Sequence, residues 1–126
     1  MKNKEDLKYL KSKGYEIEVK REGNGRFPEF GDDVLCNCVI KYYDNKEIIT
    51  SNKEAIIVPN LGFLPGFMKG FISVLKVMEE KSAVRVKIPK IDTMSVAGIP
   101  MNNIKPGRDL EIDVMLIKII RNENKK

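Results

Sequence analysis

The side chains that most enzymes use for acid-base and metal chemistry are scarce in this sequence. Its 126 residues include no histidine and no tryptophan. Histidine is the usual general base near neutral pH and a common zinc ligand, so histidine-dependent hydrolysis and histidine-containing metal sites are excluded. The sequence also lacks a phosphate-binding loop, a nucleophile elbow and carboxylates at metal-ligand spacing. We therefore expect no metal and no other cofactor.

Cys36 and Cys38 are the remaining candidates for redox chemistry, and they are one residue apart in an apolar stretch. On a β-strand both would point to the same face, roughly 7 Å apart, whereas a disulfide prefers a Cβ separation of about 3.8 Å. A redox pair would have two intervening residues at a helix start. We interpret both cysteines as small buried hydrophobic residues in a reducing compartment, which predicts a cytoplasmic protein.

The net charge of +5 comes from the two ends of the chain. Residues 1–26 carry eight Lys or Arg against five Asp or Glu, and residues 121–126 carry three against one. The remaining residues are formally neutral, which favours solvated ends over a polyanion-binding surface. An RNA- or DNA-associated protein that works through its basic ends is the alternative, and steep salt dependence of binding would be its signature.

The composition, with 42% apolar and 33% charged residues, is typical of one folded domain with a single hydrophobic core. No apolar run approaches the ~20 residues of a membrane span, and the first residues lack the apolar segment of a signal peptide. We expect a soluble protein that does not contact membranes. Residues 1–14 are expected to form a charged arm, residues 15–120 the domain and residues 121–126 a charged tail.

One long segment has the apolar spacing of an amphipathic helix, from Gly66 to Met78. Pro65 suits its entrance, and residues 79–82 would carry the chain out. Gly66 and Gly70 have the spacing of a membrane dimer motif, but in a soluble helix this spacing predicts close packing on a sheet. Residues 1–13 could form a short helix ending at Gly14 or remain a frayed arm.

Much of the rest alternates between apolar and polar residues, as strands do. The clearest strands lie at residues 34–42, 84–88 and 110–116, and shorter candidates lie at 15–20, 47–50 and 55–58. The long irregular stretch between Ile88 and Leu110 is a candidate site, because such loops in small domains are often functional. The layout predicted is α+β, a mainly antiparallel sheet with one helix across a face.

The order and spacing of several short motifs resemble the FKBP family of peptidyl-prolyl isomerases over about residues 15 to 120. The motifs are Gly25-Arg26-Phe27-Pro28-Glu29-Phe30-Gly31-Asp32-Asp33-Val34, Leu61-Gly62, Met68-Lys69-Gly70-Phe71, Met78, Val86-Lys87-Ile88, Ile104-Lys105-Pro106 and Leu110-Glu111-Ile112-Asp113-Val114. The resemblance implies a five- to six-stranded antiparallel half-barrel sheet wrapped around one short amphipathic helix.

The resemblance also implies a site residue by residue. The aromatic floor of the family's pocket falls on Phe71, and the backbone N–H that binds a substrate or macrolide carbonyl falls on Met68. Phe67 lies beside it, Ile112 takes a wall position, and Ile104 keeps an aliphatic position at the end of the long loop. These residues would preserve an apolar bowl.

Other pocket positions depart from the family. The tyrosine of the long strand falls on Cys38, a Phe-Asp pair falls near Ile48, Ile49 and Thr50, and a wall phenylalanine falls near Ile57. The hydroxyl-bearing tyrosine of the long loop falls around Met94 or Ser95. The polar groups that hold ligands in the family are therefore largely missing.

The resemblance implies an isomerase of proline-containing protein or peptide clients, with weakened activity and low affinity for macrolides. The alternative is a non-catalytic FKBP-like interaction or chaperone module in which Phe67, Phe71, Ile57 and Ile112 only fill a core. Such a module would bind a partner through residues 89–109, where Met94, Val96, Ile99 and Met101 supply apolar contacts.

Overall fold

The structure, a computed structural model, describes residues 4–51, 54–59, 68–94, 104–105 and 107–121. Its elements are α1 (Lys4–Ser12), β1 (Glu16–Arg21), β2 (Asp33–Tyr42), β3 (Ile48–Ser51), β4 (Ile56–Val58), α2 (Lys69–Leu75), β5 (Ala83–Ile88), η1 (Lys90–Asp92) and β6 (Leu110–Ile120). None of the helices in this part of the chain has the length and apolar character needed to cross a bilayer.

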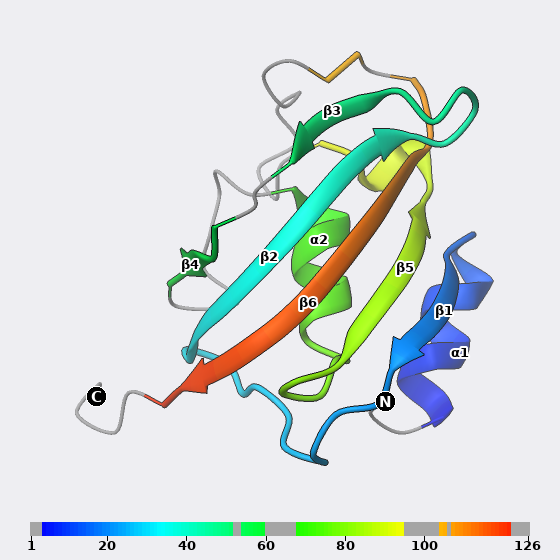
Figure 1. The fold of residues 1–126 in the computed structure, drawn as a ribbon. Coiled ribbons are helices and arrows are strands. Elements are labelled where there is room, and N and C mark those ends of the chain that lie inside the picture. The colour runs from blue at the N-terminus through cyan, green and yellow to red at the C-terminus, as the bar shows by residue number, and fades with distance from the viewer. Residues whose placement is uncertain (1–3, 52–53, 60–67, 95–103, 106, 122–126) are drawn as a thin grey trace.

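The described strands form one antiparallel sheet in the order β1-β5-β6-β2-β3, with β4 paired to the other end of β2 (Figure 1). The long strand β6 lies between β5 and β2 and pairs with both along most of its length. This is the α+β layout predicted from the alternating sequence. The predicted strand ends are confirmed to within one residue, except that β6 continues to Ile120, four residues beyond the predicted end at Leu116.

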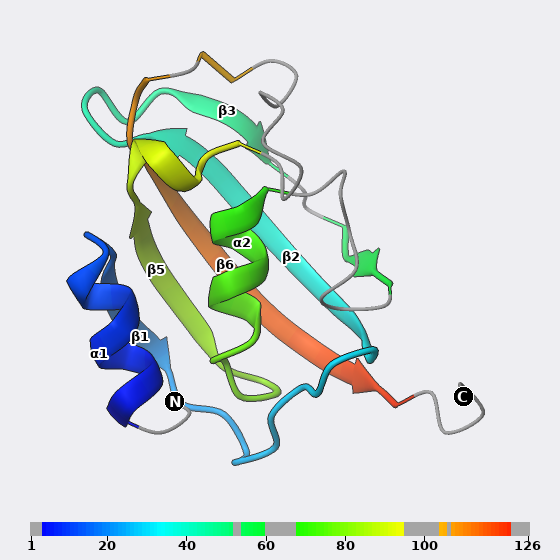
Figure 2. The same cartoon turned by 180° about the vertical axis from the view of Figure 1, so that it is seen from behind.

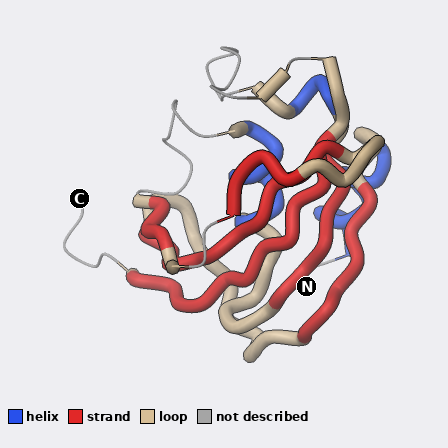
Figure 3. Tube along the Cα trace, turned by 45° about the horizontal axis from the view of Figure 1, so that its top comes forward, coloured by secondary structure: helices blue, strands red, loops and turns tan. Residues whose placement is uncertain are grey.

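Alternation along the strands gives the sheet an inner face, which the helices cover, and an outer face. Val34, Cys36 and Cys38 of β2 are buried on the inner face, while the residues between them are partly exposed. The same pattern places the buried apolar side chains of β5 and β6 on the inner face. Figure 3 shows the strands as one layer with the helices on one side. The core is therefore a single layer between sheet and helices.

Helix α2 crosses the inner face of the sheet (Figure 2). It is shorter than the predicted helix of residues 66–78, because its regular hydrogen bonding ends at Leu75. The Val77 and Met78 N–H groups donate instead to the carbonyls of Val74 and Leu75, 3.1 and 3.3 Å away, which tightens the last turn. Val77 and Met78 remain buried, so the predicted apolar face extends beyond the helix itself.

Gly70 lets α2 approach the sheet closely. A Cβ at this position would overlap Cγ2 of Ile88 on β5 and lie 3.0 Å from the Tyr15 hydroxyl oxygen. The close packing on a sheet predicted from the glycine spacing is thus confirmed at Gly70. Gly66 lies outside the described residues.

Residues 4–12 form the short helix α1, one of the two possibilities left open by the sequence. Leu10 is buried in the core, and Leu7 packs against it. Figure 2 shows α1 beside β1, on the same side of the sheet as α2. The lysine-rich segment is therefore attached to the domain by its apolar residues.

The connection from β1 to β2 is fixed by Glu79 and Glu80, which follow α2. The Gly25 N–H donates to Glu79 Oε1 at 2.6 Å, and the Glu80 N–H donates to the Arg26 carbonyl at 2.7 Å. The Glu80 carboxylate accepts Asn24 Nδ2 through Oε1 at 2.9 Å and the buried Ile119 N–H of β6 through Oε2 at 2.7 Å. One carboxylate thus joins the connection to the end of the central strand.

Candidate functional site

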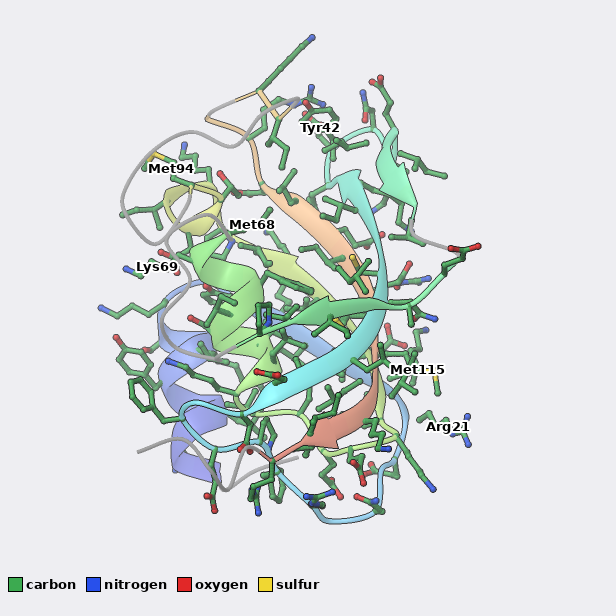
Figure 4. All side chains as sticks on the ribbon, turned by 90° about the vertical axis from the view of Figure 1, so that its left-hand side faces the viewer. Arg21, Tyr42, Met68, Lys69, Met94 and Met115 are labelled. Atoms are coloured by element: carbon green, nitrogen blue, oxygen red, sulfur yellow. The ribbon has the colours of Figure 1, made fainter. Side chains whose placement is uncertain are left out.

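The first turn of α2 is the structural centre of the candidate site. Met68 precedes the helix with an extended backbone, and its carbonyl accepts the Ile72 N–H at 3.2 Å. No side chain caps this helix end; instead the Lys69 N–H donates to the Met94 carbonyl at 2.9 Å. Figure 4 shows Met68, Lys69 and Met94 grouped on one side of the molecule. The segment after η1 is therefore bound to the helix start through its backbone.

Four of the residues expected in the pocket lie in one buried cluster. Phe71 comes from α2, Met68 directly precedes that helix, Cys38 comes from β2 and Ile112 from β6. All four side chains are almost fully buried. Ile49 and Ile104, two further expected residues, are partly buried and pack against this cluster. These six residues belong to or pack against the hydrophobic core of the domain, and their role in a pocket stays a prediction.

Ile48 and Ile57 lie elsewhere, with exposed fractions of 60% and 56%. Ile57 pairs with Leu35 and Ile48 pairs with Lys41, and both partners belong to the outer face of β2. Directly paired residues share a face, so neither isoleucine meets the cluster. The structure therefore corrects their expected placement in the pocket.

Ile56 occupies the position expected for Ile57. It pairs with the buried Cys36 and packs against the core. The sequence signal was ambiguous here because Ile56, Ile57 and Val58 are three consecutive β-branched residues without polar alternation, and a register slip of one residue exchanges the two faces.

Two expected pocket residues, Phe67 and Ser95, lie outside the described residues. The same holds for Val96, Ile99 and Met101 of the proposed partner-binding loop. Met94, which aligned with the hydroxyl-bearing tyrosine of the family, is described and contributes its carbonyl to the start of α2.

Tyr42 supports the end of the long loop, a role not assigned from the sequence. Its buried hydroxyl oxygen accepts the Lys105 N–H at 2.9 Å, and the Arg108 guanidinium carbon lies 3.7 Å from the centroid of its ring. The alternation of β2 placed Tyr42 on the inner face, but its loop partner could not be deduced from spacing. These contacts position Ile104 beside the cluster.

Tyr15 and Asp92 form a buried polar contact behind α2. The Tyr15 hydroxyl donates to Asp92 Oδ2 at 2.6 Å. Burial and this hydrogen bond to a carboxylate both raise the pKa of Tyr15 far above its ordinary value. The phenol therefore stays protonated and acts as a structural donor that joins the start of β1 to η1.

The cysteines behave as the sequence suggested. Both lie on the inner face, and neither forms a disulfide. Burial, assisted by the neighbouring Cys38, raises the pKa of the Cys36 thiol to about 12. A thiol with this pKa remains protonated at neutral pH, so Cys36 is a poor nucleophile and serves as an apolar wall.

Charged side chains are gathered on the outer face. Lys41 Nζ lies 3.2 Å from Glu111 Oε2 and 3.0 Å from Asp113 Oδ2, and Arg85 Nε donates to Asp113 Oδ1 at 2.8 Å. A hollow of about 430 Å³ beside this network is lined by residues that include Asn37, Val39, Ala83, Arg85 and Met115. The charge network and the apolar cluster thus lie on opposite faces of the sheet.

The four side chains are enclosed in the core and make the surroundings of the start of α2 apolar. None of these four buried residues offers a ready acid, base or nucleophile. Chemistry at this location must therefore act through burial, shape and backbone hydrogen bonds.

Comparison of the sequence with protein-family models and with curated proteins finds no match. Solved structures, in contrast, are closely similar in fold. FkpA from Escherichia coli superposes with a TM-score of 0.70 and 23% identity over 92% of this chain, which spans only 56% of FkpA.

Two further structures match over most of their own length. The N-terminal domain of FKBP42 from Arabidopsis thaliana has a TM-score of 0.71 and 14% identity, covering 85% of this chain and 87% of that one. A peptidyl-prolyl cis-trans isomerase from Pseudomonas syringae pv. tomato has a TM-score of 0.70 and 19% identity, covering 94% and 92%. These likenesses establish an FKBP-like fold, as the sequence resemblance implied.

Proposed function

We propose that this FKBP-like chain is a peptidyl-prolyl cis-trans isomerase that acts on proline-containing proteins or peptides. The observation that carries the proposal is the buried cluster of Met68, Phe71, Cys38 and Ile112, which joins the start of α2 to the centre of the sheet. The FKBP-like fold supports the same assignment, since one of the similar structures is a peptidyl-prolyl isomerase.

The reaction suits a site without acid, base or nucleophile. Rotation about an Xaa-Pro amide meets a barrier of roughly 20 kcal/mol because the C–N bond has partial double-bond character. A twisted amide is less delocalised than the planar one. An apolar surface that holds the proline ring, with a backbone donor for the carbonyl, favours the twisted form and lowers the barrier by differential binding. Phe71 would form the floor and Met68 would supply the backbone donor.

We expect the activity to be weak. Cys38 and Ile49 stand where the resemblance implies aromatic residues, and apolar contact contributes about 25 cal/mol per Å². Missing hydrogen bonds cost about 1 kcal/mol each. At ~1.4 kcal/mol per factor of ten, the rate should be one to three powers of ten below that of a protein with the full set of pocket residues. Macrolides should bind with low affinity for the same reason.

A protease-coupled isomerisation assay on short Xaa-Pro peptides tests this function. The protein should accelerate isomerisation above background, and Phe71→Leu should lower the rate at least several-fold while leaving a core-sized side chain in place. Val39→Ala, on the opposite face of β2, is the control and should retain the rate. A macrolide of the rapamycin type should inhibit only at high concentration. No acceleration by the folded protein would refute the proposal.

A non-catalytic interaction or chaperone module is the second candidate, and the deep burial of Phe71 and Ile112 favours it. Side chains that are fully enclosed can serve only to pack α2 on the sheet. The same assay distinguishes the two: a module of this kind would be folded, inactive and insensitive to macrolides. Its two buried cysteines suit the reducing cytoplasm, where we place either function.

A further inference from the structure

A second cavity, of about 260 Å³, lies between α1, the start of α2 and η1. It is lined by Tyr9, Leu10, Lys13, Tyr15, Lys69, Ser73, Ile91 and Asp92. Lys69 and Ser73 are one helical turn apart and belong to the side of α2 opposite to the cluster around Phe71. Small-molecule sites usually measure about 300–1,000 Å³, so this cavity suits a single side chain of a larger ligand.

The acidic and basic side chains of this cavity lie at different depths. The Asp92 side chain is only 15% exposed; its Oδ2 accepts the Tyr15 hydroxyl and its Oδ1 lies 3.8 Å from Lys69 Nζ. The Lys69 side chain is 61% exposed, and Lys13 extends at the rim with its ammonium 5.6 Å from the centroid of the Tyr9 ring. The Asp92 carboxylate is therefore held at the bottom of the cavity, while the ammonium groups of Lys13 and Lys69 lie at its exposed rim.

Two large apolar side chains are exposed at the rim of this cavity. Tyr9 of α1 is 62% exposed and Ile91 of η1 is 71% exposed, although the cavity between them reaches down to the buried Leu10. Exposed apolar side chains around a hollow with charged margins are typical of an interaction surface. The pairing of apolar walls with ammonium groups specifies a ligand that carries an apolar side chain beside a carboxylate.

We propose that this cavity binds an acidic segment of the client protein, with one apolar side chain held between Tyr9 and Ile91 and a neighbouring carboxylate held by Lys13 and Lys69. The assignment of the client as a proline-containing protein rests on the proposed function. Met68 and Lys69 are consecutive, and Figure 4 shows both beside Met94. Because Lys69 lines this cavity and an extended chain advances about 3.3 Å per residue, a client held by the Met68 N–H would reach the cavity within a few residues.

Two measurements test the inference. The first compares isomerisation of peptides with the same Xaa-Pro bond, extended by an Asp-Phe, a Lys-Phe or an Asp-Ala flank on either side. The Asp-Phe peptides should have kcat/KM values about tenfold higher at low salt. Lys13→Glu should abolish this preference, whereas Lys118→Glu, the same charge change on the exposed end of β6, should preserve it.

The second measures fluorescence anisotropy of a labelled Asp-Phe peptide without proline. Binding should weaken about tenfold in Lys13→Glu and remain in Lys118→Glu. If this peptide binds while isomerisation is absent, the proposed function fails and the docking surface stands. If isomerisation occurs but neither the flank nor Lys13 matters, the inference is overturned. Equal competition by single-stranded RNA would indicate a general polyanion surface and would likewise overturn it.

Discussion

Gly70 is the residue at which the packing of α2 on the sheet leaves the least room. Besides Ile88, an added Cβ would lie 3.1 Å from the Asp92 carbonyl oxygen and 3.0 Å from the Tyr15 hydroxyl. Gly70→Ala should therefore lower the free energy of unfolding by about 1–3 kcal/mol, although alanine favours helix by about 1 kcal/mol. Urea unfolding checks this, with the exposed Lys76→Ala as control. A stabilised Gly70→Ala would show that α2 can move away from β5 without cost.

Ile56 and Ile57 are neighbours with opposite environments, which makes them a matched pair. Ile56→Ala removes contacts with the core and should cost about 1–2 kcal/mol of unfolding free energy. Ile57→Ala, on the exposed outer face, should cost less than about 0.5 kcal/mol. Thermal and urea denaturation of the two variants measures the difference. Equal losses would contradict the register of β4 described above.

The start of β2 is held by an ion pair between Asp32 and Arg121. The buried Asp32 carboxylate accepts Arg121 Nη2 at 3.0 Å and the Glu29 N–H at 2.8 Å. Burial alone would raise the pKa of Asp32, but the hydrogen bonds from Arg121 and Glu29 outweigh it, so the pKa lies below its ordinary value. The folded state is therefore stabilised by ionised Asp32 above the ordinary pKa of about 3.9, and this contribution is lost as the pH falls through the folded pKa.

Asp32→Asn should accordingly lower the free energy of unfolding by about 1–2 kcal/mol at pH 7. The difference from the unchanged protein should shrink below about pH 4. Urea unfolding at several pH values measures both effects, and Glu18→Gln, in an exposed pair with Lys20, should change little. A difference that stays constant from pH 7 to pH 2 would rule out ionisation of Asp32 as its cause.

At the scale of elements, the sequence predicted well wherever burial alternates over many residues. β2, β5 and β6 each expose every second residue along most of their length, so their position and faces follow from the pattern. β4 has three apolar residues and no alternation, so its face depended on pairing with β2. The end of α2 depended on a change in hydrogen bonding that apolar spacing does not reveal.

Around the candidate site, the sequence identified individual residues but not the contacts between distant segments. Phe71, Met68, Cys38 and Ile112 are all buried in the core, because each is an apolar residue that its element turns toward the inner face of the sheet. The contacts made by Tyr15, Tyr42 and Glu80 join segments that are 77, 63 and 39 residues apart in sequence. Such pairs are set by the tertiary fold, and no local pattern specifies them.

At the scale of the whole molecule, stability should be graded from the centre of the sheet to its edges. β6 is paired on both sides, whereas β1 and β3 each end the sheet order. Amide hydrogen exchange should therefore be slowest in β6 and in the part of β2 beside it, and fastest in β1 and β3. Exchange measured residue by residue tests this, and protection of β1 equal to that of β6 would contradict it.

The central place of β6 has a consequence for synthesis of the chain. β1 with β5 and β2 with β3 and β4 can pair as they leave the ribosome, but within the described sheet only β6 connects the two groups. Among the described strands, β6 is also the last along the chain. Until residues 110–120 emerge, the nascent chain carries two partial sheets with open edges and an incompletely covered α2, a state that invites aggregation. The chain would therefore depend on protection until β6 is in place.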